Sequence, residues 1–235
     1  MNWTGESHTK LYRWAHRSTW GAWLRAKNIA ITTDRTRVTA PRPLYQVVKD
    51  SFQGGAKFLQ PTQINVFTDG SKSTAGVGSG YVIREGRQQY DTGTATLPND
   101  RSVHQAELLA VLLAARHLLQ DIHTLRPRFV KFFVDSRSAL AALCNRRHHS
   151  VLVQNTASAL NDLARRCRSV RLVWIKAHAG HIGNEVADRI ATGAALDPQT
   201  PHQGGILPPF SSLRQQIRKA IMEDWQLEWT RYDGG

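Results

Sequence analysis

The stretch QINVFTDG at residues 63–70 decides the fold class, because it consists of a strand-forming run followed by a pair of residues typical of a turn. The run from Gln63 to Thr68 is rich in branched and aromatic side chains, which favour a β-strand. Asp69 and Gly70 follow it as a pair typical of a turn. We therefore expect a strand that presents an acidic side chain, Asp69, at its end.

The flanking sequence predicts an alternation of strands and helices. Strand signals recur at 80–84, 88–94, 129–134 (FVKFFV) and 170–175, and helical patterns at 102–120, 151–168 and 184–195. Ser102 and Gln105 have the spacing of a capping box, Asn184 is a candidate N-cap, and a further helix opens after Asp135-Ser136. This order predicts an α/β fold with a mixed five-stranded sheet and helices packed on it.

Composition limits the classes of function. The chain has 235 residues, 41% of them hydrophobic, and a formal net charge of +13, which favours polyanionic partners such as nucleic acid, or an anionic membrane surface. Two cysteines cannot build a disulfide framework, so we expect a reducing, intracellular location. The sequence holds no run of about eighteen apolar residues and no secretory signal, so we expect no membrane span.

The uneven charge predicts three segments. Residues 1–60 carry ten Lys and Arg against three acids and form a basic N-terminal extension, in which a solvated lead-in is an equally good interpretation. Residues 61–198 form the main domain. Residues 199–235 form a linker and an amphipathic helix whose apolar stripe recurs every four residues, at Leu213, Ile217, Ile221, Trp225 and Trp229.

Four acidic residues lie where the expected elements begin or end. Asp69 and Asp135 follow strands, and the carboxyl ends of strands are where sites gather in open α/β sheets. Glu107 is the only acid between Arg101 and Gln120, in a helix that is otherwise strongly apolar. Asp188 lies one turn inside the last helix of the main domain.

Each acid also has an ordinary structural explanation. Asp69 is a candidate Asx-turn residue, Asp135 a helix cap, Asp188 a partner of a helix dipole and Glu107 part of a solvated stripe. Taken together, four carboxylates that meet at one point would repel one another unless a cation neutralised them. All-oxygen ligation suits Mg²⁺ or Mn²⁺.

Four motifs in this order resemble a type 1 ribonuclease H domain. They are FTDGSK at 67–72, HQAELLAV at 104–111, FFVDSRSAL at 132–140 and KAHAGHIGNEVADRIA at 176–191. The similarity spans about residues 61 to 198. It implies a ribonuclease H-like fold and an enzyme that cleaves the RNA strand of RNA/DNA hybrids.

The resemblance also implies a role for each site residue. Asp69 would bridge two Mg²⁺ ions, Asp188 would hold the ion on the side of the attacking water, and Glu107 and Asp135 the ion on the leaving-group side. His178 matches the loop histidine that assists proton transfer or product release. His181 is its competitor because both lie in the same glycine-flanked loop.

Contacts with the hybrid are predicted less directly. Cellular members use Asn residues just before the helical Glu, whereas this chain has Val103 and His104 there. The remaining candidates for nucleic-acid binding are Ser71, Ser102, Gln105, Ser136 and Arg137. Arginines at 165, 166, 168 and 171 form a further basic group that is equally compatible with a solvated helix end.

Three other hypotheses differ in class. A domain of the same fold that binds nucleic acid or a polymerase without catalysis is the main alternative. A proofreading exonuclease needs Asp-x-Glu on the first strand, but Ser71 stands at the position of the Glu. A transposase needs a Glu about thirty-five residues after the second Asp, but Val170 stands there.

The sequences of the motifs and the helix with Trp225 and Trp229 also resemble non-LTR retrotransposon polyproteins, which implies a neighbouring reverse transcriptase domain.

Overall fold

The computed structural model describes residues 19–29, 32–34, 39–48, 63–85, 88–120, 128–148 and 150–231. The chain groups into two compact units, one formed by Val38–Ile206 and the other by Met1–Arg37 together with Leu207–Gly235. Most of the expected N-terminal extension lies outside the described residues. The division at residues 60 and 198 stays a prediction.

Val38–Ile206 contains one six-stranded sheet in the order β1-β6-β5-β2-β3-β4. The strands are β1 (Gln46–Val48), β2 (Gln63–Lys72), β3 (Val77–Glu85), β4 (Gln88–Leu97), β5 (Phe129–Val134) and β6 (Ser169–Trp174). β2, β3 and β4 form an antiparallel meander, while β1, β6, β5 and β2 pair in parallel. The mixed α/β fold predicted from the sequence is confirmed.

The number of strands was predicted wrongly, because the sheet has six strands and not five. The additional strand, β1, pairs in parallel with β6 and adds an edge to the sheet. It has only three residues, too few to produce a periodic signal, and it lies in the segment that we assigned to a basic extension. Its position depends on Arg171, Leu172 and Val173, which lie far along the chain.

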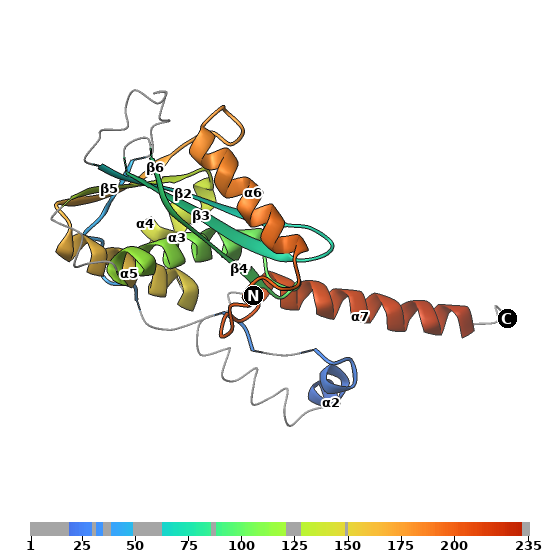
Figure 1. Ribbon diagram of the computed structural model, residues 1–235. Coiled ribbons are helices and arrows are strands. Elements are labelled where there is room, and N and C mark those ends of the chain that lie inside the picture. The colour runs from blue at the N-terminus through green and yellow to red at the C-terminus, as the bar shows by residue number, and fades with distance from the viewer. Residues whose placement is uncertain are drawn as a thin grey trace. The chain divides into compact units, whose positions relative to one another are not determined.

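Helices cover the two faces of the sheet unequally (Figure 1). On one side lie α3 (Val103–Gln120), α4 (Arg137–Cys144) and α5 (Val151–Arg166), and on the other lies α6 (Ile182–Leu196). The first side holds the larger core, which includes Val66, Leu109, Phe132 and Leu160. The smaller core under α6 includes Phe67, Phe133 and Val173, with the rings of Phe67 and Phe133 stacked at 4.7 Å.

Serine caps start three of the helices. Ser102 Oγ accepts a hydrogen bond from Gln105 N while Gln105 Oε1 accepts one from Ser102 N, so the predicted capping box is present. Ser136 caps α4 and Ser150 caps α5 in the same way. Asn184 is not an N-cap as expected, because α6 begins at Ile182 after His181.

Small residues let α6 lie directly on β3. A Cβ atom added to Gly78 would come within 2.1 Å of Ala191 O, and one added to Gly80 within 2.6 Å of Ala191 N. Both distances are far below van der Waals contact, so only glycine fits at these positions. The close packing fixes the height of α6 over the sheet and with it the positions of the side chains that α6 carries.

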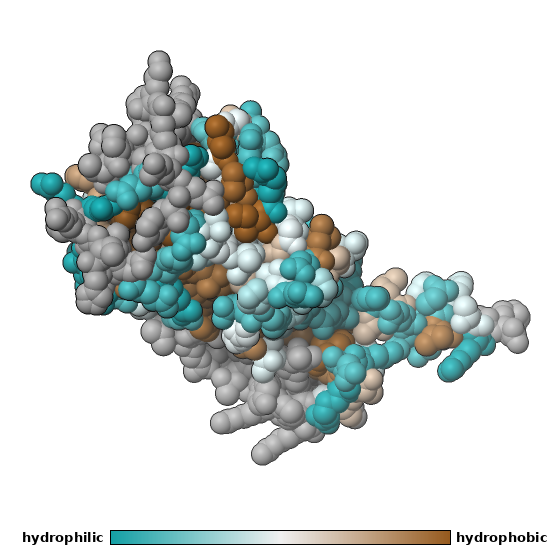
Figure 2. Space-filling view, viewed as in Figure 1, coloured by the Kyte–Doolittle hydropathy of each residue, from teal (hydrophilic) through white to brown (hydrophobic). Residues whose placement is uncertain are grey.

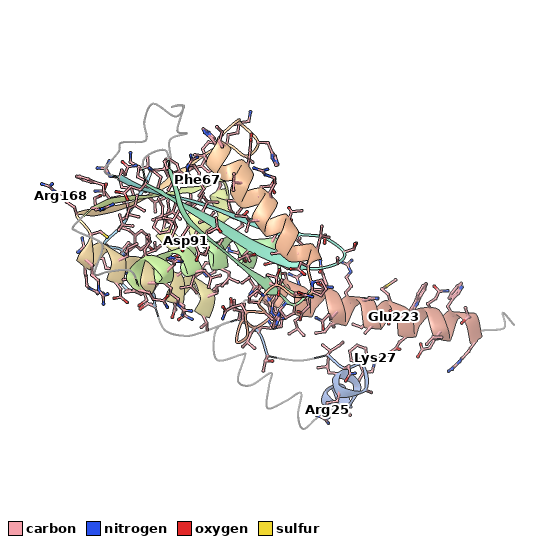
Figure 3. The ribbon with its side chains drawn as sticks, in the orientation of Figure 1. Arg25, Lys27, Phe67, Asp91, Arg168 and Glu223 are labelled. Atoms are coloured by element: carbon pink, nitrogen blue, oxygen red, sulfur yellow. The ribbon has the colours of Figure 1, made fainter. Side chains whose placement is uncertain are left out.

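The second unit has its own small core. α2 (Thr19–Ala26) supplies Leu24, which packs with Ile29 and with Leu213 and Ala220 of α7 (Phe210–Arg231). Trp23 Nε1 donates to Asp224 Oδ2 at 2.7 Å, and Lys27 pairs with the same carboxylate. Figure 3 shows Arg25 on α2, Lys27 directly after this helix and Glu223 on α7.

The predicted apolar stripe of α7 is divided by this packing. Leu213 and Ile217 belong to the core with α2, whereas Ile221, Trp225 and Trp229 are exposed. The rings of Trp225 and Trp229 stack on each other at 5.6 Å. Figure 2 shows hydrophobic patches among hydrophilic ones along this helix. Among the described helices, none is long and apolar enough to span a membrane.

Candidate metal and active site

Two adjacent parallel strands bring Asp69 and Asp135 together. Thr68 of β2 is in register with Val134 of β5, so the residue after each lies at the same edge of the sheet. Asp69 is still within β2, whereas Asp135 directly follows β5. The two strands therefore present two carboxylates side by side. The turn expected at Asp69 and Gly70 was predicted wrongly, because pairing with β3 continues β2 to Lys72.

Glu107 reaches the same point from α3 because Gly70 lets the helix approach β2. A Cβ atom on Gly70 would lie 2.5 Å from Glu107 N, which no side chain tolerates. Ser79 Oγ donates to Ala106 O at 3.0 Å and secures the helix from β3. Glu107 is thus held over the strand ends by backbone packing.

Asp69, Glu107 and Asp135 form a tight carboxylate cluster. One oxygen from each lies within 4.8 Å of the others, a spacing that fits a shared cation. Asp69 and Glu107 are each only 8% exposed. Two buried oxygens of the cluster, Glu107 Oε2 and Asp135 Oδ1, have no hydrogen-bond partner within the part of the chain described.

Burial and mutual repulsion disfavour the charged forms of this cluster. Burial, Asp135 and Asp188 raise the pKa of Asp69 to about 7, against a lowering effect of the Gly70 N–H. Burial, Asp135 and Asp69 raise the pKa of Glu107 to about 10. Buried acids of this kind are stabilised as carboxylates by a bound cation. The donor set, oxygen only, fits Mg²⁺ or Mn²⁺.

Two residues that the sequence analysis did not single out as site residues hold Asp135 in place. Asn184 is 4% exposed and its Nδ2 donates to Asp135 Oδ2 at 3.0 Å. Trp174 Nε1 donates to the main-chain oxygen of Asp135 at 3.0 Å. The only signal for Asn184 was its place one turn before Asp188, and we interpreted it as a helix cap.

Asp188 lies at the border of the cluster. It is half-buried on α6, and its charge contributes to the raised pKa of Asp69, but it is outside the group of three acids within 4.8 Å. Thr192 Oγ1 lies 3.4 Å from Asp188 Oδ1 and 3.1 Å from Ser71 Oγ. A hydroxyl of α6 thereby links Asp188 to β2.

The loop histidines are placed differently from the acids. His178 is exposed in the loop before α6 and has a positive φ of 50°, which is uncommon for a residue with a side chain. His181 is half-buried at the N-cap position of α6, where its side chain does not cap the helix. The structure does not place His178 among the three clustered carboxylates.

The candidate nucleic-acid contacts surround the helix starts beside the cluster. Ser102 and buried Gln105 satisfy each other in the capping box, and Ser136 caps α4. The guanidinium of Arg137 stacks over the ring of Trp174 at 3.9 Å, which orients it. His104 Nδ1 lies 3.1 Å from Ser138 Oγ and so joins the starts of α3 and α4.

Fold and site together define an α/β protein with a buried acidic centre of the kind that binds divalent cations. The family model for RNase H matches residues 61–196. The match covers more than half of the chain and includes all three clustered acids and Asp188. The chain belongs to the RNase H family.

Comparisons with solved structures and with curated sequences were also made. The crystal structure of RNase H1 from the halophilic archaeon Halobacterium salinarum NRC-1 is similar, with 16% sequence identity and a TM-score of 0.45. The similarity covers 56% of this chain and 96% of that chain. A comparison with curated protein sequences gave no match.

Proposed function

We propose that the chain is an endonuclease that hydrolyses the RNA strand of an RNA/DNA hybrid with the aid of divalent cations. The observation that carries this proposal is the cluster of Asp69, Glu107 and Asp135 in a chain of the RNase H family. Two buried oxygens of these acids have no hydrogen-bond partner among the described residues, which a protein tolerates where a ligand completes the site.

Asp69, Glu107, Asp135 and Asp188 would hold two Mg²⁺ ions, for which Mn²⁺ is an alternative. When bound, the ions supply Lewis-acid stabilisation of phosphate charge and a nucleophilic water at neutral pH. Water would attack the phosphorus, and the bond from phosphorus to the 3′ oxygen would break. The products would carry a 5′-phosphate and a 3′-hydroxyl.

The residues around the acids would orient them. Asn184 and Trp174 fix the side chain and the main chain of Asp135, so its free oxygen, Oδ1, keeps one direction. Gly70 N–H donates to Asp69 Oδ1 at 2.7 Å and lowers the cost of its charge. His178, exposed in the loop before α6, would assist proton transfer or product release.

Contacts with the hybrid would come from the helix starts. Arg137, oriented by Trp174, would bind a phosphate, and the hydroxyls of Ser71, Ser102 and Ser136 would contact the sugar-phosphate backbone across the minor groove. Gln105 would act by holding Ser102 in place. His104, at the position of an expected Asn, is engaged with Ser138.

A cleavage assay tests the proposal. Labelled RNA/DNA hybrid, duplex DNA and duplex RNA are incubated with the chain in Mg²⁺, and we expect internal cleavage of RNA in the hybrid alone. Asp69→Asn and EDTA should each abolish the product. Hybrid binding without cleavage, unchanged by Asp69→Asn, would instead favour a domain that binds nucleic acid or a polymerase.

We also propose that the chain is part of a non-LTR retrotransposon polyprotein or a remnant of one. This proposal rests on the motif wording and on the helix with Trp225 and Trp229. Sequencing the transcript tests it, because a reverse transcriptase reading frame in phase with this chain is expected. An unrelated reading frame on both sides would contradict it.

A further inference from the structure

A row of polar side chains crosses the sheet on the face where α6 lies. The core under α6 contains Phe67, Phe133 and Val173. Because side chains alternate along a strand, the residues two positions earlier project from the same face. They are Asn65, Lys131 and Arg171, and the register places all three side by side on neighbouring strands.

Lys131 and Arg171 bring two positive charges directly opposite each other on β5 and β6. Arg171 is exposed and Lys131 is half-buried. Neither forms an ion pair with a carboxylate within the described part of the chain. α6 packs mainly against β2, β3 and β4, and Asn65 is fully buried. Within the described residues, the part of this face that reaches solvent is therefore the part around Lys131 and Arg171.

An aromatic ring and a third cation lie next to this pair. Phe129 is two residues before Lys131 on the same face of β5 and is 42% exposed, which is unusual for a phenyl ring on a strand. The guanidinium of Arg168 lies 5.6 Å from the centre of that ring. Figure 3 shows Arg168 at the end of the sheet away from α6, whereas Phe67 lies near the start of α6. We call Phe129, Lys131, Arg168 and Arg171 the basic sheet face.

This arrangement costs stability unless an anion is present. Like charges directly opposite each other on neighbouring strands are destabilising. Burial and the neighbouring Arg171 lower the pKa of Lys131, which shows the same repulsion. Arg165 differs from this set because it is paired with Asp162 on α5, on the other side of the sheet. The basic group seen in the sequence is therefore two groups. In the α5 group Arg165 has an acidic partner, whereas neither Arg168 nor Arg171 has one among the described residues.

We propose that the basic sheet face binds single-stranded nucleic acid. Unpaired cations attract phosphates of any nucleic acid, but an exposed aromatic ring beside them binds the face of an unpaired base, which a duplex does not offer. Lys131 precedes Asp135 by four residues, about 13 Å along the strand. The ligand is a single-stranded tail that continues from a hybrid held at the carboxylates, and in this respect the inference extends the proposed function.

Binding to a single strand tests the inference without catalysis. A fluorescent DNA oligonucleotide of about 12 nucleotides is titrated with the full chain in EDTA, at several salt concentrations. The double variant Lys131→Gln/Arg171→Gln should reduce the slope of log K against log salt by about 1.4. Phe129→Ala should weaken binding about tenfold. The control variant Arg165→Gln/Arg166→Gln removes the same amount of charge from α5. It should change the salt slope and the affinity by no more than about a third of the changes expected for the basic sheet face.

Hybrids with and without a tail give the second test. The wild-type chain should bind a tailed hybrid more tightly than a blunt one, and Lys131→Gln/Arg171→Gln should abolish the difference while leaving cleavage of the blunt hybrid unchanged. Equal effects of the β5/β6 and α5 double variants, or no effect of the tail on binding, would overturn the inference. A chain that does not cleave the hybrid, but whose salt slope for the single strand is still reduced by Lys131→Gln/Arg171→Gln, would overturn only the proposed catalysis.

Discussion

At the scale of single residues, the site concentrates negative charge that the fold alone does not neutralise. Asp69 and Glu107 are buried beside Asp135, and their pKa values rise to about 7 and about 10. In a metal-free chain these acids oppose folding at neutral pH, since the folded state holds protons that the unfolded state has already lost. Activity and stability therefore make opposite demands on the same side chains.

The pH dependence of stability follows with a definite sign. Unfolded Asp and Glu lose their protons near pH 4, whereas the folded chain keeps them to about pH 7 at Asp69 and about pH 10 at Glu107. The contribution of these groups is present at low pH and is lost as the pH rises through that interval. In EDTA the melting temperature should be lower at pH 8 than at pH 5, and Mg²⁺ at pH 8 should raise it.

Asp69→Asn should flatten this dependence and raise the melting temperature in EDTA at pH 8 by about 2–8 °C. Asp162→Asn, which removes an exposed acid from α5, serves as the control and should not raise it. Thermal unfolding followed by circular dichroism measures both. If Asp69→Asn leaves the melting temperature unchanged or lowers it, the charge of Asp69 does not destabilise the folded state.

Asn184 is a positioning residue for Asp135. Asn184→Ala removes the donor to Asp135 Oδ2, and loss of such an outer partner costs about 10–100-fold in metal affinity or activity. We expect kcat on the hybrid to fall within that range and the Mg²⁺ concentration needed for half-maximal rate to rise, with little change in KM. Asn155→Ala, an exposed change on α5, is the matched control. An unchanged Mg²⁺ requirement would contradict the positioning role.

At the scale of elements, the contact between α6 and β3 sets the site because α6 carries both Asn184 and Asp188. Gly78→Ala would place a Cβ 2.1 Å from Ala191 O and force α6 away from the sheet. We expect a loss of about 1–3 kcal/mol in the free energy of unfolding and a large loss of hybrid cleavage. Denaturant unfolding and the cleavage assay measure these effects.

Gly193→Ala provides the matched control. Gly193 lies on α6, and a Cβ atom added there would meet no atom within 4 Å. Alanine favours a helix over glycine by about 0.5–1 kcal/mol, so this variant should be slightly more stable and equally active. A Gly78→Ala chain as stable and active as Gly193→Ala would mean that the helix height is not critical.

Local signals account for what the sequence could predict at this scale. Phe129–Val134 was predicted to the residue because a dense run of aromatic and β-branched side chains ends at Asp135. The capping box of Ser102 and Gln105 needs only a three-residue spacing. The approach of Asp69 and Asp135 follows from parallel strands whose ends meet at one edge, so it also could be anticipated.

Contacts between distant segments account for what was missed. The strand character of Gln46–Val48 comes from pairing with β6, more than a hundred residues later, and leaves no mark in three residues of sequence. Asn184 has the local pattern of a cap, and its contact with Asp135 is visible only once α6 is placed against the sheet. The exposure of Phe129 could not be predicted either, because the sequence does not show which part of a sheet face a helix covers.

At the scale of the whole molecule, the elements that build the site all fall within Val38–Ile206. We therefore expect a fragment of residues 38–206 to unfold cooperatively and to cleave hybrid at a rate within about threefold of the full chain, a difference of less than about 1 kcal/mol. Calorimetry and the cleavage assay test this. A fragment that is unfolded, while the full chain is active, would show that the second unit is needed for the fold.

The end of that fragment can be argued from the edge strand β4. Residues after 198 bind to the end of this strand, since Thr96 N donates to Pro201 O and Gln203 N donates to Thr96 O, each at 2.9 Å. Beyond the strand, Arg101 Nε donates to Ile206 O at 2.6 Å. A fragment of residues 38–198 loses these bonds and exposes the edge. At about 1 kcal/mol for each hydrogen bond, it should be about 2–4 kcal/mol less stable than 38–206 in denaturant unfolding. Equal stability of the two fragments would place the end of the domain at 198, where the sequence alone had put it.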